Sequence, residues 1–397
     1  MKRTLSFLLF QVCFFSQLNA QWFNLTSGTT AALNGVWFTD SVTGYVVGAN
    51  GSMLKTTDGI SWFPISVSAN DDFNSVVFVN DSTGFVVGTY GIYKTSNSGN
   101  TWNLYTSAAR LWDVFFATQL VGYACGDSGV LYKTLDCGTT WNILPTSDPG
   151  SSYRGLYFLS ADTGYIVSSV LFGSVMRTVD GGVNWVSVSG NLTGARDDVW
   201  FTDQNHGYIV ASPGGSVVTT IDGGNNWSFV SPGGPGLTSL EFLSDSVGYA
   251  VGGLAFSYGA IERTVDAGGT WNVQTVSAPG MLLDIYFATD SIGYSVGENG
   301  TILKTLNGGI SGLAELEPST LNICVYPNPV GTTLGISNQS GKPTTVIFRN
   351  LSGQEVQRLV VTNRYTIIDT SLWTDGIYSL TFIRDSATRT EKLIIAH

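Results

Sequence analysis

Hydrophobic residues follow one pattern that returns seven times between residues 33 and 311. Each copy reads apolar-x-x-Val-x-Phe, then Gly-Tyr, then Lys/Arg-Thr-x-Asp-Gly-Gly-x-x-Trp, and residues 111–141 show it clearly. Apolar and polar positions alternate within the copies, β-branched residues are frequent, and glycines separate the apolar runs, which is typical of short β-strands joined by turns. The pattern therefore predicts an all-β protein.

The period of the repeat indicates the architecture. Equivalent phenylalanines lie 38 to 45 residues apart. A period near 40 is typical of a β-propeller with one four-stranded blade per repeat, because an isolated blade cannot bury both of its faces. Seven copies predict a seven-bladed β-propeller over residues 21–310. The equivalent phenylalanines are Phe38, Phe78, Phe116, Phe158, Phe201, Phe242 and Phe287.

The two ends of the repeat region complement each other. The seventh copy reaches Gly309 but lacks the tryptophan that ends the other copies, whereas residues 21–27 resemble residues 101–107 and contain Trp22. We therefore predict that the N-terminal strand completes the last blade and closes the ring. Closure would protect the strand edges that an open sheet leaves unpaired.

Segments outside the repeats have other compositions. Residues 1–20 combine Lys2 and Arg3 with an apolar run and a small residue at position 20, which predicts a secretory signal peptide. Residues 311–320 read as a linker. Residues 321–397 alternate short strands with glycine turns, which predicts a small β-sandwich as a second domain.

Charge and histidine content narrow the possible functions. Residues 21–308 contain 22 Asp and Glu but only 9 Lys and Arg, so the propeller would repel phosphate backbones and we expect no nucleic-acid partner. The only histidines are His206 and His397, which argues against histidine metal sites and Ser-His triads. We expect a monomer with no metal and no cofactor.

The Thr-x-Asp-Gly-Gly-x-x-Trp segment suits a tight turn, because Asp and Thr side chains accept turn N–H groups and glycine tolerates positive φ. It resembles the Asp box of sialidases, and the skeleton over residues 22–309 is similar to the neuraminidase-type repeats of photosystem II assembly factors. Two copies carry Asn97 and Asn307 instead, a change that a turn tolerates and that catalysis would not. The aspartates expected to be structural are Asp58, Asp136, Asp180, Asp222 and Asp266.

The second domain carries motifs in a characteristic order. They closely resemble the C-terminal sorting domain of type IX secretion cargo, although a plain adhesive sandwich is an alternative. The resemblance implies the type IX secretion machinery as a partner, and release or surface attachment outside a Gram-negative bacterium. The residues that carry it are Tyr326, Pro327, Asn328, Pro329, Gly376 and Tyr378.

Catalysis would need residues that the repeats do not supply by motif. Sialidases resembling this chain use an arginine triad, a Tyr/Glu pair and an Asp acid, none of which is identifiable here. Paired carboxylates are the remaining route to hydrolysis. Asp113, Asp198 and Asp284 occupy equivalent places on the innermost strands, and Glu241 replaces an aromatic residue in copy six. We expect solvated polar positions at the channel mouth, with a ligand site or catalytic groups as alternatives.

One face of the propeller departs from the repeat. Loops between the second and third strands are longer in copies four and six, and charged residues begin the nearby inner strands. Aromatic side chains beside fixed charges suit sugars or peptides, although such aromatics can also be local packing. We predict an exported, non-catalytic surface propeller that binds a glycan or a protein or has a structural role; a sialidase-like glycoside hydrolase is the alternative. The candidate ligand-binding residues are Arg154, Phe172, Arg196, Asp197, Asp198, Phe256 and Tyr258.

Overall fold

The computed structural model describes residues 22–309 and 323–395, with short gaps at 68–70, 108, 147, 149, 170–173, 191, 193, 212–214, 231–235, 275, 327–331, 339–341, 351–352, 364 and 385–386. Residues 22–309 belong to one compact unit and residues 323–395 to another. The predicted signal peptide and the predicted linker lie outside the described residues.

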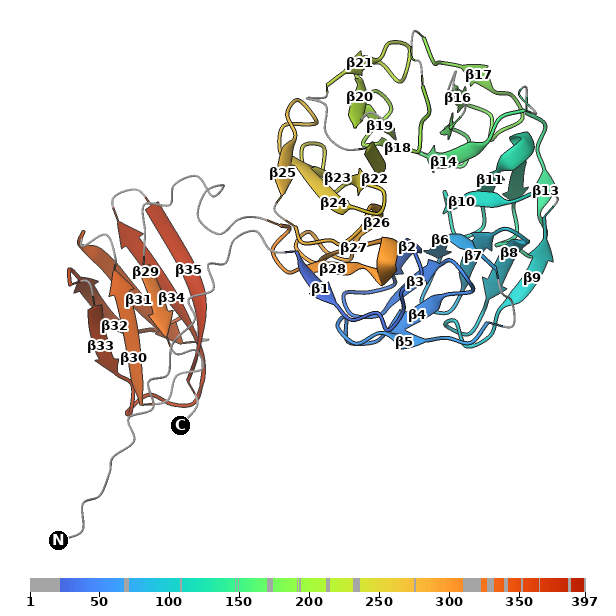
Figure 1. Cartoon of the computed structure of the whole chain (residues 1–397). Helices are drawn as coiled ribbons and strands as arrows, with labels where there is room; N and C mark the ends of the chain where they lie inside the picture. Colours follow the sequence, from blue (N-terminus) through green and yellow to red (C-terminus); the bar gives the residue numbers. More distant parts are fainter. Residues whose placement is uncertain are drawn as a thin grey trace. The chain divides into compact units, whose positions relative to one another are not determined.

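Residues 22–309 form seven four-stranded antiparallel sheets around a central opening (Figure 1). The first strand of each blade lies nearest the centre. Blades one to three contain β2 (Leu33–Phe38), β3 (Gly44–Gly48), β4 (Met53–Thr56) and β5 (Phe63–Pro64); β6 (Phe73–Phe78), β7 (Gly84–Gly88), β8 (Gly91–Thr95) and β9 (Asn103–Thr106); and β10 (Leu111–Phe116), β11 (Gly122–Gly126), β12 (Leu131–Thr134) and β13 (Asn142–Ile143).

The remaining blades follow the same order around the ring. They contain β14 (Tyr153–Phe158), β15 (Gly164–Ser168), β16 (Val175–Thr178) and β17 (Val186–Ser187); β18 (Asp198–Phe201), β19 (Gly207–Ala211), β20 (Ser216–Thr220) and β21 (Ser228–Phe229); β22 (Gly236–Phe242), β23 (Gly248–Leu254), β24 (Tyr258–Thr264) and β25 (Asn272–Gln274); and β26 (Leu282–Phe287), β27 (Gly293–Gly297) and β28 (Ile302–Thr305).

The N-terminal strand completes the seventh blade, as the sequence predicts. Strand β1 (Phe23–Leu25) pairs antiparallel with β28 and places Phe23 opposite Lys304. Trp22 is only 4% exposed and meets Phe287 edge-on at 5.8 Å between ring centroids. The tryptophan that follows the turn in the other blades makes the same edge contact, as Trp62 does with Phe38 at 5.9 Å. The all-β fold and the closed seven-bladed ring are therefore confirmed.

The phenylalanine that ends each first strand is the centre of packing between blades. Phe38 lies so close to Gly44 that a Cβ atom there would meet its ring at 2.4 Å, so a larger residue would not fit. Tyr294 of the preceding blade stacks on the other side at 4.0 Å. Similar stacked pairs join Tyr45 with Phe78, Tyr123 with Phe158, Tyr165 with Phe201 and Tyr208 with Phe242.

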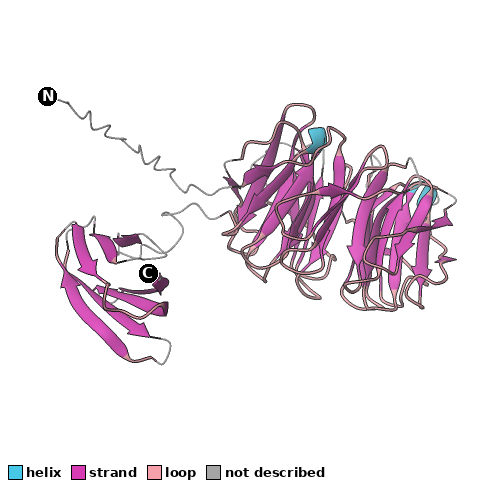
Figure 2. Cartoon of the chain, turned by 90° about the horizontal axis from the view of Figure 1, so that it is seen from below, coloured by secondary structure: helices cyan, strands magenta, loops and turns pink. Residues whose placement is uncertain are grey.

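The second domain is a β-sandwich, as predicted. One sheet has the order β29 (Ile323–Tyr326), β30 (Thr333–Asn338), β33 (Tyr365–Asp369); the other has the order β32 (Glu355–Val361), β31 (Thr344–Asn350), β34 (Gly376–Arg384), β35 (Ala387–Ile395). Buried residues of both sheets, including Leu334, Ile368 and Phe348, form one core. The described residues contain no helix with the length and hydrophobicity of a membrane span, and Figure 2 shows strands throughout both units, with η1 (Asp127–Gly129) and η2 (Glu298–Gly300) as short helical turns.

Candidate functional site

The repeated turns between the third and fourth strands hold their aspartates in hydrogen bonds within the turn. Asp180 accepts the backbone N–H of Asn184 at 2.9 Å with Oδ1, while Oδ2 accepts the Asn184 side-chain amide at 2.7 Å. Thr178 donates its hydroxyl to Asp180 and accepts the N–H of Gly182. These bonds stabilise the charged carboxylate and lower the pKa of Asp180. We call these turns the rim turns; their aspartates are Asp58, Asp136, Asp180, Asp222 and Asp266.

The rim turns also join neighbouring blades. Tyr294 donates its hydroxyl to the carbonyl of Gly59 at 3.1 Å, and the Lys304 ammonium donates to the same oxygen at 2.8 Å. Gly59 has a φ of +67°, the left-handed conformation that turns its carbonyl toward the preceding blade. Tyr123 and Lys133 contact Gly181 in the same way. The turn residues are thus part of the ring's framework.

The inner-strand aspartates join blades inside the channel. Asp284 accepts the N–H of Val36 across the seam between blades seven and one at 2.8 Å. It also accepts the N–H of Ile285 at 2.9 Å and the hydroxyl of Ser239 at 3.0 Å. Asp113 accepts equivalent bonds from Leu156, Val114 and Ser75, and Asp198 from Leu240 and Val199.

Burial changes the acidity of these carboxyl groups. It raises the pKa of Asp284 to about 6, although its hydrogen bonds act in the opposite direction. Burial also raises the pKa of Asp113, Asp198 and Glu241, and the neighbouring carboxyl charges add to the effect at Asp198 and Glu241. The sequence predicts that the three aspartates are solvated at the mouth. They are half-buried and line the mouth of the channel, and they also accept inter-blade N–H groups, which need acceptors there, so they form part of the channel wall.

A belt of aromatic side chains lines the channel next to these carboxyl groups. Adjacent rings tilt against each other, with 4.8 Å between the centroids of Trp37 and Tyr286 and 4.9 Å between those of Tyr157 and Trp200. The belt encloses a cavity of about 340 Å³ together with the aspartates. We use the name aromatic belt for Trp37, Phe115, Tyr157, Trp200 and Tyr286.

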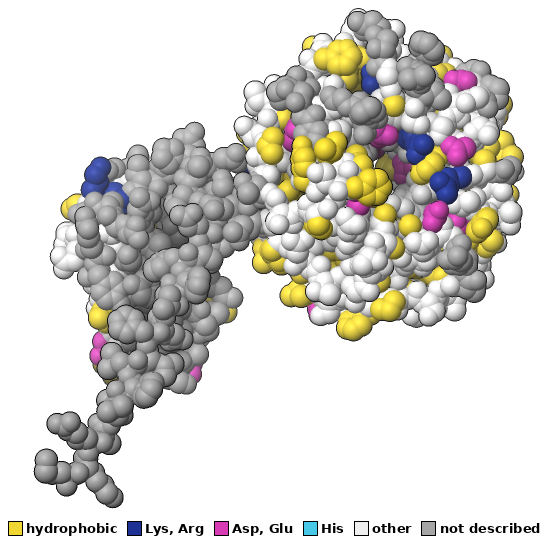
Figure 3. Space-filling view, in the orientation of Figure 1, with side chains coloured by type: hydrophobic (Ala, Val, Ile, Leu, Met, Phe, Trp, Pro, Cys, Tyr) yellow, Lys and Arg dark blue, Asp and Glu magenta, His cyan; other side chains and the backbone are white. Residues whose placement is uncertain are grey.

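A smaller pocket of about 140 Å³ lies at the channel mouth, where Arg154, Asp197 and Asp198 come together. The guanidinium carbon of Arg154 lies 3.6 Å from the centroid of Trp112, and Arg154 also donates to Ser169. Trp112 donates its indole N–H to Asp127 at 2.7 Å. Figure 3 shows basic and acidic side chains gathered beside the central opening.

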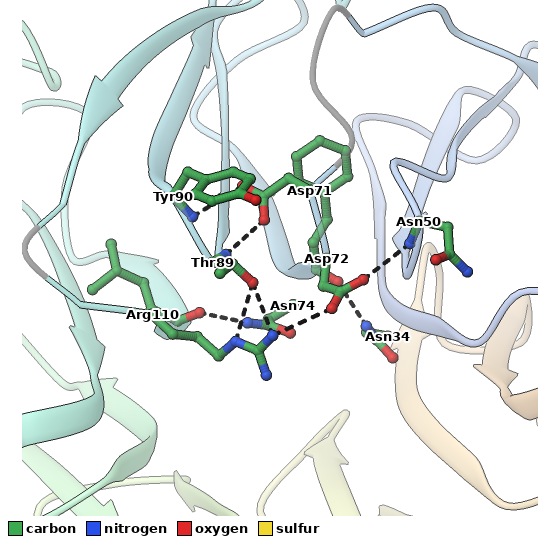
Figure 4. Close-up of polar contacts among 10 residues, drawn as sticks. Asn34, Asn50, Asp71, Asp72, Asn74, Thr89, Tyr90 and Arg110 are labelled. Atoms are coloured by element: carbon green, nitrogen blue, oxygen red, sulfur yellow. Dashed lines mark hydrogen bonds and ion pairs between the residues drawn. The ribbon is translucent and has the colours of Figure 1, made fainter.

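Hydrogen bonds hold the mouth loops in place next to this pocket (Figure 4). Arg110 pairs with Asp72 at 3.2 Å and donates to the Thr89 hydroxyl at 2.9 Å. Asp71, only 1% exposed, accepts the N–H groups of Thr89 and Tyr90. Arg110 also lies over the Trp112 ring at 5.1 Å. The platform of Trp112 and two arginines is therefore built on fixed loops.

The other candidate ligand residues lie elsewhere. Arg196 is 2% exposed and donates to the carbonyl of Ala195, so the structure buries a side chain that the sequence analysis placed on an accessible face. Phe256 is 86% exposed and Tyr258 47% exposed on the β23–β24 hairpin, outside the mouth pocket. Glu298 accepts the N–H of Phe256 at 2.7 Å and so anchors the hairpin to blade seven. Phe172 lies outside the described residues.

Sequence reasoning missed Trp112 and the aromatic belt. The belt residues occupy the position before the repeated phenylalanine in five of the seven copies, and Val77 and Glu241 stand there in copies two and six. In the sorting motif, Gly376 begins β34, and Tyr378 is buried with its hydroxyl donating to the Thr374 carbonyl at 2.8 Å. Pro327, Asn328 and Pro329 lie outside the described residues, as does the side chain of Tyr326.

Comparisons with known proteins agree with this architecture. Residues 324–396 match the family of secretion system C-terminal sorting domains, and residues 15–112 match the family of the photosynthesis system II assembly factor YCF48. No curated protein matches the chain. The sorting segment indicates export by type IX secretion to the cell surface or extracellular space.

Solved structures show the same fold at low sequence identity. A structure of YCF48 bound to a D1 peptide has 22% identity and a TM-score of 0.62, covering 72% of this chain and 97% of its own. YCF48 from Cyanidioschyzon merolae has 21% identity and a TM-score of 0.60, covering 72% and 98%. A GH74 enzyme from Niastella koreensis has 13% identity and a TM-score of 0.59, covering 94% and 67%. The chain thus combines a propeller similar to that of the YCF48 assembly factors with a C-terminal sorting domain of the type IX secretion type.

Proposed function

We propose that this protein is an exported, non-catalytic propeller that binds an extracellular glycan or protein through its channel-mouth face. The observation that carries the proposal is the platform of Trp112 and Arg154 at the mouth pocket, which is fixed by hydrogen bonds and does not recur around the ring. Rim-turn aspartates, by contrast, direct their carboxylate oxygens to their own turns. A specific partner can recognise only residues that distinguish one blade from another.

The exposed hairpin of blade six extends this binding face. Leu254, Phe256 and Tyr258 project from the loop between the second and third strands, which is the same face as Arg154 by topology. Tyr, Trp and Arg are enriched among the residues that dominate binding energy. The structure of YCF48 with a D1 peptide supports the idea that a propeller of this type can hold a polypeptide.

A screen for ligands tests the proposal directly. The chain without its predicted signal peptide, including the sandwich domain, would be applied to glycan and extracellular-protein arrays, beside Arg154→Ala and Arg358→Ala variants. Arg358 is an exposed arginine of the sandwich domain that pairs with Glu355, so its loss controls for charge alone. We expect ligands that bind the unmodified protein and the control but lose roughly tenfold or more affinity with Arg154→Ala. Equal binding by all three proteins would contradict the assignment.

Hydrolysis is the second candidate, because burial raises the pKa of Asp284 to about 6, within the range of a general acid. GH74 enzymes are also among the structural neighbours. Against it, each inner-strand aspartate accepts backbone N–H groups from two blades. A glycan hydrolysis panel run with the binding screen separates the two: release of sugar by the unmodified protein that is lost with Glu241→Gln would favour the enzyme.

Export is tested by removing the sandwich domain. We expect a chain truncated after residue 317 to fold its propeller and remain in the periplasm, because the predicted signal peptide and the sorting domain act in separate steps. Fractionation of the cells, with the full chain as control, measures the distribution. Normal display or release of the truncated chain would contradict the role given to residues 318–397.

A further inference from the structure

The central cavity is not used by the proposed function. Its volume of about 340 Å³ is within the range of cavities that hold small organic ligands. It is continuous with the mouth pocket, because Asp113, Asp198 and Asp284 line both. The cavity therefore has an entrance and is large enough for more than a single water molecule.

The aromatic belt gives this cavity a chemical preference. Trp37, Tyr157 and Trp200 are half-buried in a channel wall that is otherwise made of strands, so their rings are exposed to the cavity. Aromatic faces carry negative electrostatic potential and attract cations, most strongly where water is excluded. A ring of such faces is how proteins recognise ammonium groups with attached methyl or methylene groups.

Glu241 interrupts the belt with a carboxyl group. Its Oε2 accepts the N–H of Phe287 at 2.8 Å, whereas its Oε1 has no hydrogen-bond donor among the described residues. The side chain lines the cavity and lies close enough to Asp198 and Asp284 to feel their charges. Partial burial of a carboxyl group with an incomplete set of donors disfavours its charged form, and a cation in the cavity would offset that cost.

The charged residues around the cavity indicate which kind of cation it would bind. Four acidic residues and no lysine or arginine line it in the described part of the chain. At the mouth, Arg154 is balanced by Asp127 and Asp197, and Arg110 pairs with Asp72. No three of the described His, Cys, Asp or Glu side chains are arranged to hold a metal ion. The cavity therefore suits an organic cation, which is larger and partly apolar, better than a metal ion.

We propose that the channel cavity binds an organic ammonium group, supplied either by a free small amine or by a lysine side chain of a bound protein. A bound cation would favour the ionised form of the carboxyl groups, which would then neutralise its charge, and the belt would contact its methyl or methylene groups. This site goes beyond the mouth platform, since a free amine would bind even if no glycan or protein occupied the mouth.

Calorimetric titration of the unmodified full chain tests the site without any substitution. Choline is the probe, and 3,3-dimethylbutan-1-ol is its control because it has the same shape with carbon in place of the charged nitrogen. We expect choline to bind, and the neutral alcohol to bind at least about tenfold more weakly. Equal binding of the two, or no binding of choline at millimolar concentrations, would overturn the proposal.

A pair of variants locates the binding in the channel. Glu241→Gln keeps an oxygen that can accept the Phe287 N–H but removes the charge. Asp245→Asn removes one charge from an exposed loop of the same blade and serves as the control. We expect roughly tenfold weaker choline binding with Glu241→Gln and none of this loss with Asp245→Asn. Equal affinities of the two variants would show that the cation binds elsewhere.

Two peptides distinguish the possible sources of the ammonium group. One is a short peptide with a central lysine, and the other is the same peptide with that lysine acetylated. Binding of the lysine peptide in competition with choline, lost on acetylation, identifies a protein partner. Binding of choline alone identifies a free amine. Either result supports an ammonium site, whereas equal binding of both peptides without competition by choline contradicts it.

Discussion

Carboxyl groups on the rim turns and in the channel have the same chemistry but opposite surroundings. Asp136 on the rim is exposed, and N–H and hydroxyl donors of its own turn lower its pKa to about 2. Asp284 in the channel also accepts three hydrogen bonds, yet burial raises its pKa to about 6. At the exposed rim, hydrogen-bond donors therefore set the direction of the pKa shift. In the channel, the loss of hydration outweighs the donors. Both sets of aspartates therefore stabilise the ring, the rim set within single turns and the channel set between blades.

The largest expected effect comes from removing the packing that closes the propeller ring. Trp22→Ala removes the ring that completes blade seven, and we expect it to lower the free energy of unfolding by about 3–5 kcal/mol. Trp112→Ala at the mouth is the matched control and should cost much less, because Trp112 is only half-buried. Chemical denaturation of both variants measures the difference. Similar losses would mean that the mouth is as structural as the closure.

The pH dependence of stability separates the two sets of carboxyl groups. The rim aspartates, whose pKa is lowered in the folded state, stabilise the fold above about pH 4, and this contribution is lost as the pH falls toward 2. The channel carboxyl groups, whose pKa is raised in the folded state, stabilise the fold below about pH 4, and this contribution is lost as the pH rises through 6. We expect the unfolding free energy to be greatest near pH 4–5 and to fall on both sides. Stability that rose steadily from pH 4 to 8 would contradict the assigned burial.

Glu241→Gln should have a smaller effect, confined to the alkaline side. The substitution removes a carboxyl group whose pKa is raised by burial, so it should increase stability at pH 8 and change little at pH 4. The Phe287 N–H keeps an acceptor. Thermal unfolding at the two pH values measures the effect. A loss of stability at pH 8 would show that the charge itself is needed in the fold.

Asp180→Asn should have the smallest effect. Asparagine can still accept the N–H of Asn184, and Asn97 and Asn307 already occupy this position in two blades, where Asn97 accepts the N–H of Thr101 at 2.9 Å. The stability of the variant should fall less at acidic pH than that of the unmodified protein. Its melting temperature at pH 7 should stay the same. A large drop in melting temperature at pH 7 would show that the charge, and not the turn geometry, is essential.

The repeated features of this molecule could be predicted from sequence, because the same residue types pack in the same way in each blade. Phe38, Gly44 and Trp62 recur with their partners at fixed spacing, and the absent last tryptophan pointed to Trp22. The inter-blade hydrogen bond of Asp284 and the burial of Arg196 could not be predicted, since both depend on tertiary contacts. The belt residue Trp200 aligns with Glu241, but only the closed ring shows that this column faces a cavity.

The central claim is that ligand contacts lie on the channel-mouth face and not on the rim turns. The affinity of a ligand found in the screen should be measured for four proteins: unmodified, Phe256→Ala/Tyr258→Ala, Asp222→Asn, and Phe63→Ala as an exposed phenylalanine on an outer strand. We predict a loss of about 1–3 kcal/mol in binding free energy for the double variant only, with stability nearly unchanged. An equal loss with Asp222→Asn in a folded protein, and none with the double variant, would contradict the account.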